Sequence, residues 1–305
     1  MHEIASHDFQ GSEVGRVLDY ALDDSGKMIR ANLLLACADF GPDSQDKKDR
    51  LCMLAAMIEL IHLASLIHDD IVDESDFRRG KPSVQSKYHK DAAVYAGDFL
   101  ITRVNHTLAA RKLNESSMAL SKTIEMMCAG EIAQALCRYN EKSTAEDYLN
   151  TIKGKTAELF KTACKVGASE AGAGADIVSI LSNIGEALGI MFQLRDDLLD
   201  FSPRAEIGKA SHLDFREGIY TLPVLKALEN DTEGKLLRYA KENAQRSLTS
   251  DEITEVEKLT AELGGVEATK QSIKNCRTVI EGLLTVLPDI PSKKFLSELT
   301  AKLDD

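Results

Sequence analysis

Two segments of the sequence carry the same arrangement of acidic side chains. They are LIHDDIVD, with Asp69, Asp70 and Asp73, and FQLRDDLLD, with Asp196, Asp197 and Asp200. In a helix, the first and last aspartates of each DDxxD motif share one face at a separation of about 5–6 Å. Like charges at that distance repel each other, and the apolar run before each motif makes the repulsion stronger through desolvation. The spacing therefore predicts that a cation lies between the carboxylates.

Magnesium is the cation that best fits these motifs. Mg²⁺ is typically held by one or two carboxylates, and waters and phosphate oxygens complete its coordination shell. A single DDxxD motif is explained equally well by a solvated acidic helix end. Two motifs with the same spacing, each after an apolar run, instead favour a diphosphate bridged by Mg²⁺ to two facing helices.

A diphosphate also requires cations and hydrogen-bond donors, which arginine and lysine supply in different geometries. The candidates are Lys27 and Arg30 in GKMIR, Arg78 and Arg79 after the first motif, Lys155, Thr156, Gln193, and Lys209 after the second motif. His62 precedes Asp69 by two helical turns and falls on nearly the same face. Each of these residues alone is equally compatible with an ordinary surface or core position.

Composition and helix-breaking residues predict an all-α chain. Of the 305 residues, 44% are apolar and only 5% aromatic, and no proline occurs between Pro82 and Pro203. Apolar residues such as Leu54, Met57 and Ile61 recur at helical spacing. Glycine and proline predict helix breaks at Gly41-Pro42, residues 79–82, Gly167 to Ala175, Ser202-Pro203, Gly264-Gly265 and Pro288 to Pro291. We expect a single domain over residues 1–305, with the motifs in about 26–228 and a C-terminal helical layer over about 231–305.

Charge and hydropathy exclude several classes of protein. The formal charge of -12 argues against nucleic acid as a partner. The six cysteines show no CxxC pair, as is typical of reduced thiols. The start, MHEIASHDFQ, has no signal-peptide pattern. The apolar run from Leu51 to Ile67 contains the polar residues Glu59 and His62, so we expect a buried core helix and not a transmembrane segment. We therefore expect a cytoplasmic protein.

The order of these motifs resembles that of the trans-isoprenyl diphosphate synthases, also called polyprenyl synthetases, and in particular the bacterial medium- and long-chain enzymes. The resemblance lies in GKMIR, HLASLIHDDIVDESDFRRGKPS, GDFL, GEIAQ, KTAELF, FQLRDDLLDF and EGIYTLPVL. It implies a bundle of roughly ten or more helices around a deep central cavity, usually as a homodimer. It also implies a Mg²⁺-dependent condensation of isopentenyl diphosphate with an allylic diphosphate, which gives an all-trans polyprenyl diphosphate.

The resemblance assigns roles to the residues named above. Asp69, Asp73, Asp196 and Asp200 are expected to bind up to about three Mg²⁺ ions, with support from Asp70 and Asp197. The expected contacts of the allylic diphosphate are Arg78, Lys155, Thr156, Gln193 and Lys209, and Lys155 is also expected to take part in catalysis. The expected contacts of isopentenyl diphosphate are Lys27, Arg30, His62 and Arg79.

Four residues depart from the family pattern: Met28, Ala31, His212 and Ile219. Ile219 stands where short-chain members usually carry a lysine that touches the allylic diphosphate. Its absence resembles bacterial medium- and long-chain synthases, some of which work only with a small partner subunit. A hetero-oligomer is therefore an alternative to the homodimer.

The residues before the first motif bear on product length. Ala64 and Ser65 are small where short-chain enzymes often place an aromatic residue, and Ile61 lies one turn below them. We call Ala64, Ser65 and Ile61 the chain-length wall. A growing prenyl chain could pass these residues, which predicts a product longer than farnesyl unless another helix blocks its path. The alternatives are a farnesyl or geranylgeranyl diphosphate synthase, one half of a two-component hexaprenyl or heptaprenyl synthase, a terpene cyclase, and a non-catalytic subunit.

Overall fold

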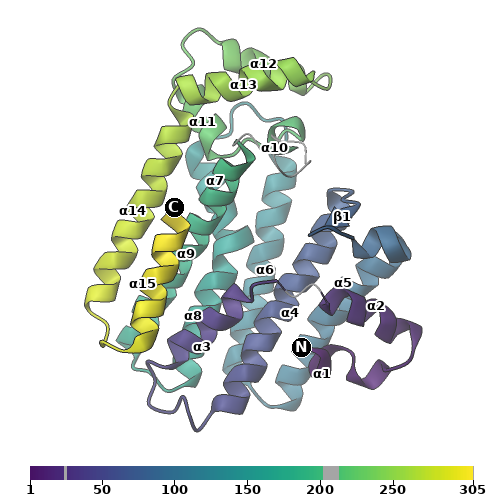
Figure 1. The fold of residues 1–305 in the computed structure, drawn as a ribbon, viewed down its shortest axis with the longest axis vertical. Helices are drawn as coiled ribbons and strands as arrows, with labels where there is room; N and C mark the ends of the chain where they lie inside the picture. Colours follow the sequence, from purple (N-terminus) through teal and green to yellow (C-terminus); the bar gives the residue numbers. More distant parts are fainter. Residues whose placement is uncertain (24–25, 202–212, 305) are drawn as a thin grey trace. The chain divides into compact units, whose positions relative to one another are not determined.

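The computed structural model describes residues 1–23, 26–201 and 213–304, and helices make up most of this part of the chain. The all-α prediction is therefore confirmed (Figure 1). The helices are α1 (His2–Ala5), η1 (His7–Phe9), α2 (Glu13–Leu22), α3 (Ile29–Ala38), α4 (Lys48–Val72), α5 (Val84–Ala110), α6 (Asn114–Leu136), α7 (Ala145–Ile152), η2 (Lys153–Ala157), α8 (Glu158–Glu170), α9 (Ala175–Asp200), α10 (Leu213–Arg216), α11 (Leu222–Glu229), α12 (Lys235–Asn243), α13 (Ser250–Glu262), α14 (Gly265–Thr285) and α15 (Pro291–Asp304). Strands β1 (Phe77–Arg78) and β2 (Lys81–Pro82) form a short antiparallel hairpin.

These elements form two compact units. Unit 1 contains Met1–Ile124 and Thr162–Leu181, and unit 2 contains Glu125–Lys161 and Ser182–Asp305. The chain passes from one unit to the other within α6, α8 and α9. The first acidic motif belongs to unit 1 and the second to unit 2. A single domain over the whole chain stays a prediction.

Helix α4 is the central element of unit 1. It packs against α3 and α5, and α5 also packs against α2. Leu54, Met57, Ile58 and Leu60 on α4 have no exposed surface. By length and composition α4 and α9 could each cross a bilayer, but 61% of the most apolar part of α4 is buried in the protein. The prediction of a buried core helix over Leu51 to Ile67 is thus confirmed.

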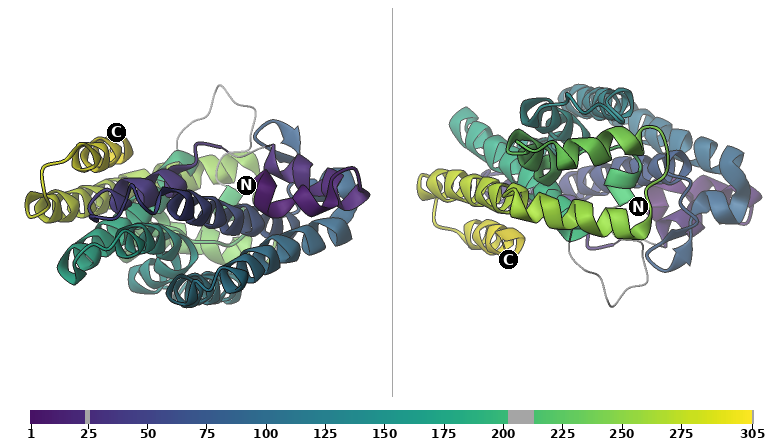
Figure 2. Two further views of the ribbon diagram at one scale, coloured as in Figure 1. Left: turned by 90° about the horizontal axis from the view of Figure 1, so that it is seen from below. Right: turned by 90° about the horizontal axis from the view of Figure 1, so that it is seen from above.

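Unit 2 is built around a core formed by the segments that follow the second motif. Its buried members include Phe215, Tyr220, Val224 and Leu236, and Tyr148 of α7 packs against them. Helix α11 packs against α13 and α14, and α14 lies beside α15 (Figures 1 and 2). Helices α12 to α15 form the C-terminal helical part expected from about residue 231.

Most of the predicted helix breaks are present. The chain leaves the helical conformation at Gly41-Pro42, at residues 79–82, at Gly264 and between Pro288 and Pro291. The break predicted over Gly167 to Ala175 is shorter than expected, because α8 continues to Glu170. The break predicted at Ser202-Pro203 lies outside the described residues.

Other breaks were not predicted, among them those after α5 and α6, which no glycine or proline marks. Helix α5 ends before Lys112, which has a φ of 56°, and the loop after α6 contains Tyr139, with a φ of 59°. Non-glycine residues rarely adopt this left-handed conformation. In the loop after α6, Tyr139 is held by the hydrogen bond that its N–H donates to the carbonyl of Gly218 at 2.7 Å.

Candidate active site

Both acidic motifs lie at the carboxyl-terminal ends of long helices. Asp73 caps α4, Asp69 lies in its last turn, and Asp200 is the last residue of α9. The carboxyl end of a helix carries partial negative charge, so it destabilises nearby carboxylates. Neither helix has a basic residue in its last turn. The negative charge of the carboxylates is therefore not offset by a basic residue in the last turn of the same helix. This strengthens the expectation that each motif binds a cation.

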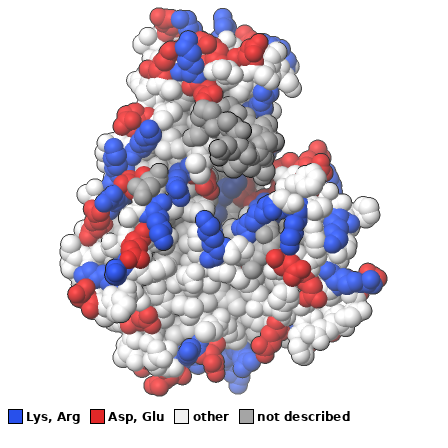
Figure 3. All heavy atoms as spheres, in the orientation of Figure 1, with Lys and Arg blue, Asp and Glu red and all other residues white. Residues whose placement is uncertain are grey.

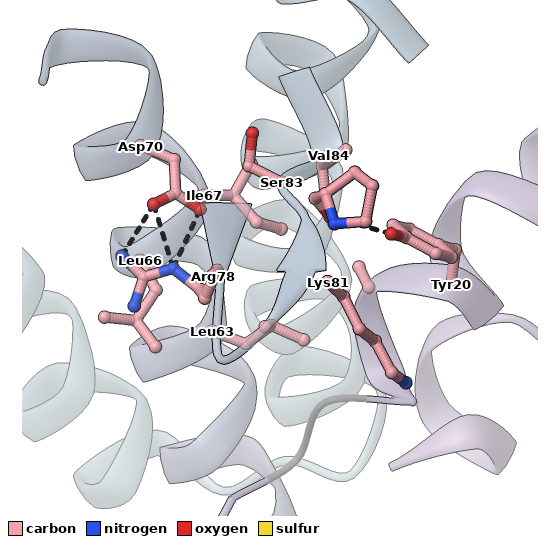
Figure 4. Close-up of a pocket in the computed structure, with 11 residues that line it drawn as sticks. Tyr20, Leu63, Leu66, Ile67, Asp70, Arg78, Lys81, Ser83 and Val84 are labelled. Atoms are coloured by element: carbon pink, nitrogen blue, oxygen red, sulfur yellow. Dashed lines mark hydrogen bonds and ion pairs between the residues drawn. The ribbon is translucent and has the colours of Figure 1, made fainter. Parts of the chain in front are cut away.

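The central aspartate of the first motif is buried and bound within the protein. Asp70 is 3% exposed, and Arg78 Nε donates to its Oδ1 at 2.9 Å and to its Oδ2 at 2.8 Å (Figure 4). Arg78 Nη2 lies 2.7 Å from Oδ1. The sequence predicted a diphosphate contact for Arg78, and the structure gives this guanidinium an internal carboxylate partner. The role expected for Asp70 in support of metal binding stays a prediction.

A short hairpin presents Arg78 and Arg79. Its two-residue loop, Arg79-Gly80, has φ values of 49° and 81°, as the tight turns favoured in hairpins require. The side-chain amide of Gln85 donates to the carbonyls of Asp70 and Ser75, so the hairpin base is tied to the end of α4. The orientation of Arg78 therefore follows from the fold of residues 75–85.

Three arginines surround His62 in unit 1. Burial, together with the positive charges of Arg30, Arg78 and Arg79, lowers the pKa of His62 to about 2. Gly26 lies against Arg79, because a Cβ at this position would come within 2.4 Å of Nη1. The structure thus brings together His62, Arg30 and Arg79 of the predicted isopentenyl diphosphate group. The fourth member, Lys27, is exposed one residue after Gly26. A bound anion would offset the concentrated positive charge.

His68, the residue before Asp69, is half-buried beside the GDFL segment. Its Nε2 lies 3.3 Å from the carbonyl of Val94 and 3.4 Å from Oδ1 of Asp98. A Cβ on Gly97 would lie 2.3 Å from that nitrogen, so only glycine leaves room for the ring. The GDFL segment therefore supports the helix turn that carries Asp69.

The second motif repeats the pattern of the first. Its central residue, Asp197, is 1% exposed, whereas Asp196 is exposed and Asp200 is half-buried. Asp197 Oδ2 accepts a hydrogen bond from the hydroxyl of Tyr148, and its Oδ1 accepts one from Gln193 Nε2 at 3.1 Å. Burial raises the pKa of Asp197 to about 8, although both hydrogen bonds act in the opposite direction. Burial and the nearby Asp197 raise the pKa of Tyr148.

Asp200 provides a test of whether a cation fits the second motif. Its Oδ2 is buried and accepts no hydrogen bond from the residues that the structure describes. A buried carboxylate oxygen without a donor is costly, and a hard divalent cation is the partner that would satisfy it. No group of three or more metal-ligating side chains occurs among the described residues. A metal ion bound by these carboxylates would take its remaining ligands from waters and phosphate oxygens.

A π-helical turn carries Lys155 and Thr156. The turn, η2, spans Lys153–Ala157, and such turns are frequent at functional sites. Lys155 Nζ lies 3.1 Å from Oε2 of Glu131 in the GEIAQ segment, and Thr156 Oγ1 donates to Gln193 Oε1 at 2.7 Å. A Cβ on Gly130 would lie 2.6 Å from the backbone nitrogen of Lys155. The glycine of GEIAQ thus allows α6 to approach the π-turn.

Three of these features were not predicted from the sequence: the π-turn, the Glu131 partner of Lys155, and the role of Tyr148. GEIAQ could have drawn attention to Glu131, but nothing marks Tyr148. Lys209 and His212 lie outside the described residues. That the two motifs face each other stays a prediction, because they belong to different units.

The predicted chain-length wall lies in the core of unit 1. Ala64 has no exposed surface, Ile61 is 2% exposed, and Ser65 is half-buried with its Oγ donating to the carbonyl of His62 at 2.9 Å. A small cavity of about 30 Å³ beside α4 is lined instead by Leu63, Leu66 and Ile67, with residues of α2 and the hairpin (Figure 4). The role of the wall stays a prediction.

Acidic and basic side chains are interspersed on the face of the molecule drawn in Figure 3. This pattern differs from the broad basic surface typical of nucleic-acid-binding proteins. The chain is thus a helical protein with two acidic DDxxD motifs at helix ends and with basic side chains near the first motif.

Comparison with known proteins identifies the class. The sequence pattern of the polyprenyl synthetase family matches residues 12–260, and the chain belongs to this family of prenyltransferases. It is 38% identical to heptaprenyl diphosphate synthase component 2 of Geobacillus stearothermophilus over 219 aligned residues. These residues cover 72% of this chain and 68% of the relative.

Two solved structures show the same fold. A decaprenyl diphosphate synthase from Rhodobacter capsulatus has a TM-score of 0.89 and 32% identity, over 99% of this chain and 92% of that one. A geranylgeranyl pyrophosphate synthase from Lactobacillus brevis has a TM-score of 0.86 and 30% identity, over 98% and 92%. These names span different product lengths on one fold, so the fold alone does not define the product.

Proposed function

We propose that this protein condenses isopentenyl diphosphate with an allylic diphosphate in a Mg²⁺-dependent reaction and releases an all-trans polyprenyl diphosphate longer than farnesyl diphosphate. The observation that carries the proposal is the repeated geometry of the two motifs. In each, the central aspartate is buried and bound by the protein, by Arg78 for Asp70 and by Tyr148 and Gln193 for Asp197. The flanking aspartates are more exposed than the central ones, and on this proposal they bind the metal.

The metal ligands on this proposal are Asp69, Asp73, Asp196 and Asp200, as the family resemblance implies. Bound Mg²⁺ would supply positive charge that stabilises the departing pyrophosphate. Arg78, Lys155, Thr156 and Gln193 would bind the same pyrophosphate. Such preorganised charges act where negative charge develops, which lowers the barrier to ionisation.

The second substrate is assigned to unit 1. Arg30 and Arg79 would pair with the diphosphate of isopentenyl diphosphate, together with Lys27. His62 is neutral in the absence of ligand, so its imidazole would donate a hydrogen bond to a phosphate oxygen. The double bond of this substrate attacks the allylic cation, and the released pyrophosphate accepts the proton. The apolar surface of α4 would keep water from the cation.

The assembly and surroundings of the enzyme are part of the same proposal. We infer a cytoplasmic homodimer that binds up to about three Mg²⁺ ions. One observation favours a second assembly, a two-component enzyme: the Geobacillus stearothermophilus relative is named as component 2 of its synthase. On that arrangement, this chain would be the catalytic half of a two-component enzyme.

The purified chain tests the proposal directly. It is incubated with Mg²⁺, farnesyl diphosphate and labelled isopentenyl diphosphate, and the products are sized by chromatography. We expect extended prenyl diphosphates, loss of activity with a chelator, and recovery on addition of Mg²⁺. Asp69→Asn and Asp196→Asn are each expected to lower kcat by at least about a hundredfold, whereas Asp76→Asn, an exposed acid just after the first motif, is the matched control. Activity that is unchanged in both motif variants would contradict the mechanism.

A separate result distinguishes the two assemblies. A chain that is inactive alone but active with a small companion subunit would favour the two-component enzyme. A chain that is active alone as a dimer of two identical subunits would favour the homodimer.

A further inference from the structure

The hydroxyl of Tyr148 lies where the two functional segments of unit 2 meet. Tyr148 belongs to α7, which continues directly into the π-turn that carries Lys155 and Thr156. A reciprocal capping box fixes the start of α7, in which Thr144 and Asp147 bind each other's backbone N–H groups. The position of Tyr148 on α7 is therefore set by local sequence.

Two hydrogen bonds fasten this segment to α9, and a third closes the network. The Tyr148 hydroxyl donates to Asp197 Oδ2, and Thr156 Oγ1 donates to Gln193 Oε1 at 2.7 Å. Gln193 Nε2 donates to Asp197 Oδ1 at 3.1 Å, so both oxygens of Asp197 accept hydrogen bonds from the protein. Asp197 is one residue after Asp196 and three before Asp200, so its position determines where these two carboxylates lie.

We propose that Tyr148 is a positioning residue, whose hydroxyl holds the metal-binding end of α9 in register with the phosphate-binding π-turn. The inference rests on the proposed function only for the identity of the ligand. Asp197 acts here as an anchor inside unit 2, and Asp196 and Asp200 are the residues proposed to bind the cation. Partners that orient metal ligands typically matter about 10–100-fold for metal affinity or activity.

The ring and the hydroxyl of Tyr148 have separable roles. The ring packs against the core of unit 2, whereas the hydroxyl reaches Asp197. Tyr148→Phe therefore keeps the packing and removes the hydrogen bond. The matched control is Tyr220→Phe, because Tyr220 belongs to the same core and its hydroxyl donates to the carbonyl of Ala240 at 3.0 Å, away from α9. Both variants lose one buried hydrogen bond of a tyrosine.

Two measurements on the full-length chain test the proposal. The first is calorimetric titration of wild type and variants with inorganic pyrophosphate in the presence of Mg²⁺, and it needs no turnover. The second is the Mg²⁺ concentration that gives half-maximal prenyl transfer. We expect Tyr148→Phe to weaken pyrophosphate binding and to raise the half-maximal Mg²⁺ concentration by about tenfold or more. We expect Tyr220→Phe to leave both within twofold of wild type, at a similar loss of melting temperature.

The outcomes separate this proposal from the proposed function. Binding of Mg²⁺ and pyrophosphate that Tyr148→Phe weakens and Tyr220→Phe does not would support the positioning role, even in a chain that makes no prenyl product. Equal binding by wild type and Tyr148→Phe would overturn it, even if prenyl transfer is confirmed. Equal weakening by both variants would also overturn it, because a general loss of stability would then explain the effect.

Discussion

The guanidinium of Arg78 binds both carboxylate oxygens of Asp70, with Nε at 2.9 Å from Oδ1 and 2.8 Å from Oδ2. Asp70 is almost fully buried, so this ion pair keeps a charged group stable inside unit 1. Arg78 consequently has two roles. It supports the end of α4 from within, and on the proposed mechanism it also faces the allylic diphosphate.

Removal of Arg78 should therefore reduce stability as well as activity. Arg78→Ala leaves a buried carboxylate without its partner, and because Arg78 is partly exposed we expect a loss of about 2 kcal/mol in the free energy of unfolding. Urea-induced unfolding measures this loss. Arg79→Ala, at an exposed position of the same hairpin, should cost less than about 1 kcal/mol and should instead raise the KM for isopentenyl diphosphate. Similar stability losses in both variants would contradict the assigned role.

The neutral state of His62 predicts a loss of stability on acidification. Its pKa in the folded protein, about 2, lies below the ordinary value of 6.5. Below pH 6.5 the unfolded chain binds a proton that the folded protein does not, so stability falls as the pH is lowered. Between pH 7.5 and 5.5 we expect His62 to account for about 1 kcal/mol of that fall.

The comparison that isolates this contribution is wild type against His62→Gln, unfolded by urea at both pH values. The variant should lose about 1 kcal/mol less than wild type between them. Parallel losses in the two proteins would show that His62 is protonated in the folded state or is not the residue responsible.

The close approach of α6 to the π-turn predicts that Gly130 tolerates no side chain. In Gly130→Ala the added Cβ would lie 2.6 Å from the backbone nitrogen of Lys155, which must move. We expect a loss of about 1–3 kcal/mol in stability, although alanine in a helix is otherwise favoured by about 1 kcal/mol. Prenyl transfer should fall with it, because Lys155 is displaced.

Gly174→Ala is the control for this change, because a Cβ there meets no atom within 4 Å. Thermal unfolding and initial rates are measured for both variants. A Gly130→Ala protein as stable and as active as Gly174→Ala would show that the π-turn adjusts without cost.

The wall on α4 predicts a change in product length. If the growing chain passes Ala64, then Ala64→Leu and Ala64→Phe should shorten the product in the order of side-chain size. Ala55→Leu, at another buried position of α4, is the matched control and should leave the product unchanged. Chromatography of the labelled products measures their chain length. Unchanged product length in a folded and active Ala64→Phe protein would remove Ala64 from the wall.

Much of the fold could be predicted because its signals are local. The apolar spacing of α4 and the glycines and prolines at residues 79–82 and 264–265 act over a few residues, and the structure follows them. The breaks at Lys112 and Tyr139 carry no such signal. The hydrogen bond from Tyr139 to Gly218, which lies far away in sequence, holds one of these loops, so only the folded chain reveals it.

The sequence by itself determined which residues carry charge, where the helices that bear the acidic motifs end, and which family the chain resembles. Only the tertiary structure decided that Asp70 and Asp197 are the buried members of their motifs. The DDxxD spacing places aspartates on a helix face, but it does not state which face the protein covers. That depends on partners such as Tyr148, 49 residues before Asp197 in the chain, because burial is a property of packed segments.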